Sequence, residues 1–139
     1  MTDVSLAIQD AAVAALKASS VTTIVGNRIY DVPPATSAGA TATFPYVSLG
    51  EGQSIPQRAD CLDGTEHYFT VHAWSRAPGY PEVKRIAEAI RATLHDADIP
   101  VRGYRLIDLA LQSAEFMRDP DGLTSHAALS FRALVDPVD

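Results

Sequence analysis

The segment 72–96, HAWSRAPGYPEVKRIAEAIRATLHD, contains the end of a strand, a turn and a helix in succession. Alternation and a high content of aromatic and β-branched residues over 66–75 predict a strand, which Pro78, Gly79 and Pro81 then interrupt. From Glu82 onward, apolar residues recur at helical spacing and charged residues cover the other side. The apolar stripe consists of Val83, Ile86, Ala87, Ile90 and Leu94. A strand followed directly by an amphipathic helix indicates a helix that packs on a sheet.

The rest of the chain supplies one more helix and three more strands. Residues 4–18 are rich in alanine and predict a helix capped by Thr2 or Asp3. Further strands are expected over 45–50, 104–114 and 125–135, and residues 28–31 form a brief extended piece. The sequence Asp119-Pro120-Asp121-Gly122 matches a type I turn followed by a bulge glycine, so the last two strands form an antiparallel hairpin.

This order of elements, α-β-β-α-β-β, predicts an α+β fold. We expect a single domain over 1–139, with one antiparallel or mixed four-stranded sheet and two helices packed on one face. Two long loops are expected, at about 32–45 and about 51–66. The first is composed mainly of Pro, Ala, Thr, Gly and Ser, and the second is polar and contains Pro56 and Gly64.

Strand alternation sorts the side chains onto two faces of this sheet, because successive residues point to opposite sides. One face is wholly apolar and is expected to lie against the helices. It carries Val47, Leu49, Phe69, Val71, Ala73, Ile107, Leu109, Leu111, Leu129, Phe131 and Val135. The opposite face is amphipathic. It carries Tyr46, Ser48, Tyr68, Thr70, His72, Trp74, Asp108, Gln112, His126, Ser130 and Arg132.

Composition limits the class of protein. A chain of 139 residues with 47% apolar and 20% charged residues is typical of a globular protein. The net charge of −6 disfavours adhesion to the outside of DNA or to an anionic membrane. Cys61 is the single cysteine, which excludes an internal disulfide and fits a reducing compartment. Asp3 and Asp10 make the N-terminus a poor signal peptide, and no long apolar run follows, so we expect a soluble intracellular product.

One set of residues on the amphipathic face has the chemistry of a small active site. His72, Asp108, His126 and Arg132 could converge there, with a histidine as acid or base, an aspartate that orients it and an arginine that holds an anion. No nucleophile stands beside them in the sequence. The alternative interpretation is a set of hydrogen-bonded polar residues on a half-exposed or subunit-facing sheet.

Other motifs are better explained by structure than by chemistry. Cys61 lies in a polar loop without a family signature of a thiol enzyme. Asp119 and Asp121 fit a turn, since Thr124 occupies the position where a calcium loop needs glycine. The Gly50-Glu51-Gly52 stretch lacks the rest of any phosphate-binding fingerprint, and His95 suits the C-terminal end of a helix. No spacing of His and Cys supports zinc, so we expect no metal and no cofactor.

Five blocks of the sequence, taken together and in order, resemble a known family. These are VGNRIYDVPP (25–34), FPYVSLGE (44–51), EHYFTVHAWSR (66–76), EVKRIAEAIRATLHDA (82–97) and MRDPDGLTSHAALSFRALV (117–135). The family comprises the tail completion or tail terminator proteins of long-tailed phages and of gene transfer agents. The Ala- and Thr-rich insert at 35–43 is longer than the family pattern.

The resemblance implies a structural virion protein and not an enzyme. Its fold would be similar to that of the tail terminator of phage lambda. Members form a ring, usually of six subunits, at the head-proximal end of the tail tube. This ring ends tube elongation and joins the tail to the head-side connector or stopper protein, after assembly in the host cytoplasm. DNA would pass through the channel without specific binding, an expectation that the acidic net charge supports.

A ring subunit needs a surface that is soluble before assembly and buried afterwards. The amphipathic face has this character, and Tyr, Trp and Arg are enriched in interfaces. Candidate contact residues with a neighbouring subunit or partner are Tyr46, Tyr68, Trp74, Arg132 and, in the loop at about 51–66, Arg58. A small α+β enzyme or ligand-binding domain that uses His72, Asp108, His126 and Arg132 is the alternative, and an adaptor module with unrelated partners is a third possibility.

Overall fold

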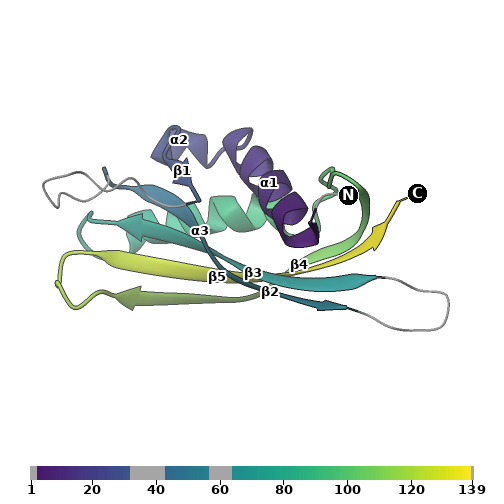
Figure 1. Ribbon diagram of the computed structural model, residues 1–139. Coiled ribbons are helices and arrows are strands. Elements are labelled where there is room, and N and C mark those ends of the chain that lie inside the picture. Colours follow the sequence, from purple (N-terminus) through teal and green to yellow (C-terminus); the bar gives the residue numbers. More distant parts are fainter. Residues whose placement is uncertain (1–2, 32–42, 57–63, 139) are drawn as a thin grey trace, which may run out of the picture.

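The computed structural model describes residues 3–31, 43–56 and 64–138. One mixed sheet carries three helices on the same side, so the described part is a two-layer α+β structure (Figure 1). Its elements are α1 (Val4–Lys17), α2 (Thr22–Val25), β1 (Ile29–Tyr30), β2 (Tyr46–Pro56), β3 (Thr65–Ser75), α3 (Pro81–Leu94), β4 (Tyr104–Arg118) and β5 (Ser125–Pro137). None of the helices in the described ranges is both long enough and apolar enough to cross a membrane.

Within the described ranges the sheet has five strands in the order β1-β2-β3-β5-β4, and the prediction of four strands is therefore wrong in number. The additional strand is β1, which pairs in parallel with β2 through Ile29 and Val47. It comes from the brief extended piece at 28–31, whose two paired residues are too few to show a strand periodicity. The remaining strands pair in antiparallel fashion, as expected.

Both predicted helices form, and the capping and apolar residues that predicted them have the expected roles. The Asp3 carboxylate accepts a hydrogen bond from the Leu6 N–H at 3.1 Å and caps α1. Pro81 stands at the first position of α3, where its missing N–H costs no helical hydrogen bond. The whole apolar stripe of α3 is buried. The short α2 comes in addition and buries Val25 against the core.

The core lies between the helices and the apolar face of the sheet. Phe69 of β3 pairs with Phe131 of β5, and their rings stack at a centroid distance of 5.4 Å within the buried cluster. The predicted apolar face is confirmed there. Ile107 is an exception, since it is 50% exposed. A bulge between Leu106 and Asp108 shifts the alternation of β4, so strict alternation assigns this residue to the wrong surface.

The predicted loop at about 51–66 is wrong over much of its length. Residues 51–56 extend β2, and their register includes Gln53 opposite Tyr68 and Ile55 opposite Glu66. These residues are exposed and mostly polar, so backbone pairing with β3 and not burial makes this stretch a strand. The loop at about 32–45 lies outside the described residues except for its last three positions. Arg58 and Cys61 are also outside the described residues.

The predicted turn between the last two strands is confirmed. The Gly122 N–H donates to the Asp119 carbonyl at 3.0 Å, and the Asp119 N–H donates to the Thr124 carbonyl at 2.8 Å. Gly122 has φ +73°, a conformation that glycine adopts without strain. The Asp121 carboxylate accepts from the N–H groups of Leu123 and Thr124, which ends the turn and starts β5.

Candidate interaction face of the sheet

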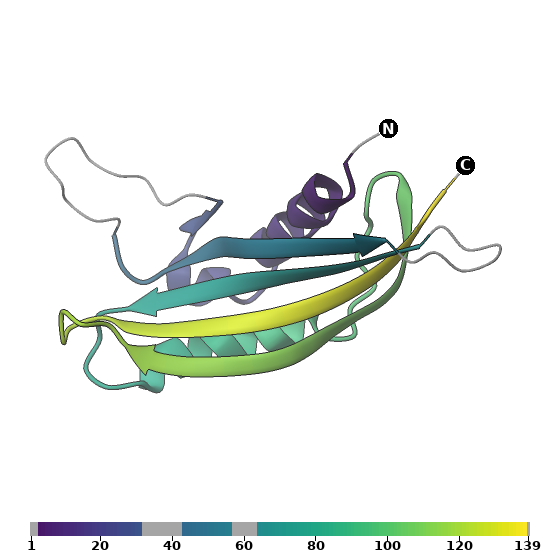
Figure 2. The ribbon, with the colours of Figure 1, turned by 60° about the horizontal axis from the view of Figure 1, so that its bottom comes forward.

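The sheet face opposite the helices, called the open face below, is not covered by any of the described helices (Figure 2). Its polar and aromatic side chains come from β2, β3, β4 and β5 and fall into two clusters. The first, called the imidazole–indole cluster, lies near the β4–β5 turn and comprises Tyr46, Ser48, Glu51, His72, Trp74 and His126. The second, called the ion-pair cluster, lies toward the other end of the strands and comprises Glu66, Tyr68, Asp108 and Arg132. A row of small hydroxyl residues, which includes Thr70 and its β5 partner Ser130, separates them.

The imidazole–indole cluster is held by hydrogen bonds and ring stacking. His126 stacks on Trp74 with ring centroids 3.8 Å apart and an interplanar angle of 10°. The Trp74 indole N–H donates to the Ser48 hydroxyl at 3.0 Å. The Tyr46 ring also stacks on Trp74, with ring centroids 6.0 Å apart. The cluster comprises Tyr46, Ser48, Glu51, His72, Trp74 and His126.

Two histidines form the centre of this cluster. The His72 Nδ1 lies 2.6 Å from the His126 Nε2, and the His72 Nε2 lies 2.9 Å from the Glu51 Oε1. A carboxylate only accepts, so His72 donates from Nε2, and in the neutral ring its Nδ1 accepts from the His126 Nε2–H. Burial foremost, and the nearby His72, lower the pKa of His126. The lowered pKa of His126 therefore favours its neutral ring in this contact.

A glycine makes room for this histidine pair. A Cβ added at Gly50 would lie 2.3 Å from the His72 Nε2, which is shorter than any van der Waals contact. Gly50 belongs to the irregularity between Leu49 and Gly52, where β2 has more residues than its partner strand. The bulge thus brings Glu51 to His72, and the Glu51 carboxyl has a lowered pKa from its own backbone hydrogen bond and from His72.

The ion-pair cluster is centred on Arg132. Its guanidinium donates from Nε and Nη2 to the Glu66 Oε2, the Nε bond being 2.7 Å long. The Tyr68 hydroxyl donates to the Glu66 Oε1 at 2.9 Å. Asp108 lies farther away, 3.7 Å from the Arg132 Nη1. Hydrogen bonds from Arg132 and Tyr68 lower the pKa of Glu66, so both charges persist at neutral pH.

The four residues of the predicted active site do not converge. His72 contacts His126, and Arg132 lies near Asp108, but these are two separate pairs. Positions 126 and 132 of β5 are about 20 Å apart at the rise of an extended strand. A cavity of about 320 Å³ on this side is lined by Glu51, Gly52, Gln53, Tyr68, Phe69, Thr70 and Ser130, and by none of the four residues. The positions of these four residues therefore do not support the enzyme interpretation.

The candidate contact residues differ in how far they are available. Tyr46 is only 9% exposed, and its ring lies among Tyr30, Phe44 and Trp74. Desolvation raises the pKa of its hydroxyl. Tyr68, Trp74 and Arg132 are half-buried on the open face. Tyr46 therefore supports this surface from within, and the other three form part of the surface itself.

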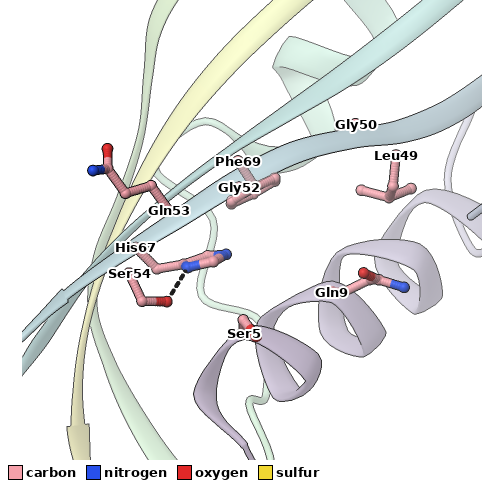
Figure 3. A pocket seen from close by; sticks show the side chains of 9 residues that line it. All are labelled: Ser5, Gln9, Leu49, Gly50, Gly52, Gln53, Ser54, His67 and Phe69. Carbon is pink, nitrogen blue, oxygen red and sulfur yellow. Dashed lines mark hydrogen bonds between the residues drawn. The ribbon is translucent and has the colours of Figure 1, made fainter.

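A second cavity, also of about 320 Å³, lies on the helix side, between α1 and the strands β2 and β3. Ser5 and Gln9 of α1 face Ser54 and His67 across it (Figure 3). His67 is buried and its Nδ1 lies 2.7 Å from the Ser54 Oγ. Burial lowers the pKa of His67, and Asp3 partly offsets this. His67 was not among the predicted site residues, although alternation with Phe69 and Val71 places it on the helix side.

The other candidates have structural explanations. The His95 Nδ1 accepts from the Leu111 N–H at 3.0 Å and ties the end of α3 to β4. It therefore acts as a specific acceptor, in addition to its place at the helix end. Among the residues that the structure describes, no group of three or more His, Cys, Asp or Glu side chains could hold a metal ion.

Comparisons with known proteins point to one family. The family model described as "Tail completion protein gp17" matches residues 10–136. Among solved structures, a chain of "Virion of native gene transfer agent (GTA) particle" is similar with a TM-score of 0.84 and 30% sequence identity. The similarity covers 98% of this chain and 99% of that chain. No curated protein matches the sequence.

Proposed function

Because this chain belongs to the tail completion protein gp17 family, we propose that it forms a ring that caps the tail tube and ends its elongation. The family is one of structural phage tail proteins, and the chain is not an enzyme. In the proposed role, a ring of six subunits sits at the head-proximal end of the tube. It also presents a surface to the head-side connector.

The observation that carries this proposal is the division of the sheet into two unlike faces. The apolar face is buried under the chain's own helices, with Phe131 and Val71 fully inaccessible. The open face keeps Tyr68, Trp74 and Arg132 at a surface without a described helix over it. Aromatic and arginine side chains on an otherwise polar surface are typical of protein–protein contacts. We assign the open face to contact with another tail component.

The charge of the chain supports a passive role toward DNA. A net charge of −6 opposes attraction of the phosphate backbone. On the open face, Arg132 is neutralised by Glu66 and lies near Asp108. The ring would therefore let DNA pass without holding it. Virion localisation and assembly in the host cytoplasm follow from the same role.

A matched pair of lysine substitutions tests the assignment of the open face. Ser130→Lys adds a charge in the centre of this face, and Ala92→Lys adds the same charge on the exposed side of α3. Each variant is mixed with purified tail tubes and sedimented with them. We expect wild type and Ala92→Lys to sediment with the tubes, and Ser130→Lys to remain in solution. Equal capture of both variants would remove the open face from the interface.

A further inference from the structure

The cavity between α1 and β2 is lined by neutral groups that form hydrogen bonds (Figure 3). These side chains are Ser5, Gln9, Gln53, Ser54 and His67. Burial lowers the pKa of His67, so its ring is neutral at neutral pH. A hydroxyl, a carboxamide and a neutral imidazole each donate and accept hydrogen bonds. The cavity therefore suits a neutral group of the same kind, such as a carboxamide, better than it suits an ion.

Several of these groups have no hydrogen-bond partner among the described residues. His67 is 5% exposed, and its Nδ1 contacts the Ser54 Oγ. Its Nε2 bonds to none of the described residues and points to the side of the cavity on which Gln9 lies (Figure 3). In the described ranges every fully buried side-chain N or O has a partner, so this nitrogen is reached from the cavity. The cavity therefore offers a mostly buried imidazole to a ligand.

A glycine of β2 keeps this imidazole uncovered. A Cβ added at Gly52 would lie 3.3 Å from the His67 Cε1 and 3.5 Å from its Nε2, so a larger side chain there would crowd the ring. Gly52 and Gln53 also line the cavity on the open face. Two cavities therefore flank the same stretch of β2, one on each side of the sheet.

The outer edge of β2 is open beside these two cavities. β1 pairs with β2 only at Val47 and Ser48. Within the described ranges, no strand pairs with the outer side of residues 51–56, and no backbone hydrogen bond from another segment reaches it. Figure 2 shows this part of β2 at the margin of the sheet. An open edge binds an extended segment through backbone hydrogen bonds, and alternate side chains of that segment enter pockets on the two sides. The two cavities lie where such side chains would point.

The opposite edge of the sheet does not supply a fitting segment from a second copy. Residues 95–98 lie along the first part of β4 and bond to it, which leaves residues 112–118 without such a neighbour in the described ranges. On that stretch Ala114 and Phe116 face the helix side, because their partners on β5 are buried core residues. Neither carries a carboxamide, and Gln112 lies in a bulge outside the regular alternation. The site therefore fits a segment of a different protein better.

We propose that the edge of β2 and its two flanking cavities bind an extended segment of the tail tube protein. The segment pairs with residues 51–56 and inserts an asparagine or glutamine side chain into the cavity beside His67. This rests on the proposed function, which places the tube against the cap. The site also adjoins the open face, because Gly52 and Gln53 line the cavity there, so one partner can contact both surfaces.

A matched pair of substitutions and a hydrogen-exchange measurement test this site. Gln9→Met removes a carboxamide from the cavity and keeps the length of the side chain. Gln112→Met makes the same change at an exposed position of β4. We expect wild-type circular dichroism spectra and urea midpoints for both. Each protein is titrated against purified tail tubes in a sedimentation assay, and amide exchange over 51–56 is measured by mass spectrometry with and without tubes.

Gln9→Met is expected to bind tubes about tenfold more weakly or worse, because the inserted carboxamide of the tube protein loses a hydrogen-bond partner. Gln112→Met should bind as wild type does. In the wild-type chain, exchange over 51–56 should slow about tenfold or more when tubes bind, since new backbone hydrogen bonds protect the edge.

Wild-type binding by Gln9→Met, or unchanged exchange over 51–56, would overturn the site while leaving the cap intact. Weakened binding by Gln112→Met would overturn the assignment to the tube protein in favour of a second copy. Slowed exchange over 51–56 without tubes, as the concentration of the chain rises, would do the same. Failure of the wild-type chain to bind tubes would contradict the proposed function itself.

Discussion

The His72 Nδ1 and the His126 Nε2 lie 2.6 Å apart on the open face, and the second ring nitrogen of His72 contacts Glu51. Two neutral rings satisfy this geometry with one shared proton between them. Two protonated rings would place N–H donors and positive charges against each other. The lowered pKa of His126 therefore links the stability of the open face to pH.

Stability should decrease when the pH falls below about 6.5, the ordinary pKa of histidine. Burial lowers the pKa values of His126 and His67 in the folded chain, so the unfolded chain takes up protons first. The free energy of unfolding, from urea titrations of the free chain, should be lower at pH 5.5 than at pH 7.5. Glu51 and Glu66, whose carboxyl pKa values are lowered, take up protons below about pH 4.5. They therefore do not change the stability between pH 7.5 and 5.5.

Replacing His67 and His126 tests whether these two residues cause the pH dependence of stability. The double variant His67→Gln, His126→Gln removes two groups that the unfolded chain would protonate. Its loss of stability between pH 7.5 and 5.5 should be clearly smaller than that of wild type. An identical loss in the double variant would mean that other groups cause the pH dependence.

Gly50→Ala should destabilise the chain by about 1–2 kcal/mol through His72. The new methyl group would lie 2.3 Å from the His72 Nε2, so the imidazole must rotate away and lose its hydrogen bond to His126. Urea unfolding measures the cost. The same substitution in a His72→Ala background should cost much less, which isolates the pair by a double-mutant cycle. Equal costs in both backgrounds would place the strain elsewhere, for example at the Thr70 carbonyl.

Two substitutions on β5 test the division of the sheet into faces. Phe131→Ala should cost about 3–5 kcal/mol, because Phe131 is completely buried and stacks on Phe69. Leu134→Ala, three positions along the same strand, removes a half-buried side chain from the open face and should cost much less. Unfolding free energies from urea titrations give both values. Similar costs would contradict the assignment of Leu134 to the open face.

The chain should not bind DNA measurably. Non-specific DNA-binding proteins have dissociation constants of about 1–100 µM at physiological salt. With a net charge of −6, we expect no change in the anisotropy of labelled duplex DNA over this range, even at low salt. Binding that weakens steeply as salt increases would show a basic surface on the chain and would contradict the passive channel.

The periodicity of the sequence was sufficient to predict both long helices, the β4–β5 hairpin and most of the apolar face. Their signals are local: a capping Asp3, the stripe that ends at Leu94, and the turn at 119–122. The parallel strand β1 escapes prediction because it has only two residues and depends on a partner far along the chain. The end of β2 escapes because the exposed, mostly polar residues there owe their conformation to backbone pairing with β3.

The candidate site was predictable as a face but not as a set of contacts. Alternation places His72, Trp74, His126 and Arg132 together on one side, and the structure confirms this. Which of these side chains meet depends on the order of the strands in the sheet. Alternation along each strand does not reveal that order. Ile107 shows the other limit, because an extra residue in a bulge breaks the strict alternation of the strand at that position.

The length of tail tubes grown in the presence of this protein tests the central claim most directly. Tube protein is allowed to polymerise, the chain is added at increasing concentration, and tube lengths and ends are measured by electron microscopy. The proposed role predicts that tubes stop growing and carry a ring at one end only. Tubes that continue to lengthen with bare ends at saturating protein would contradict it.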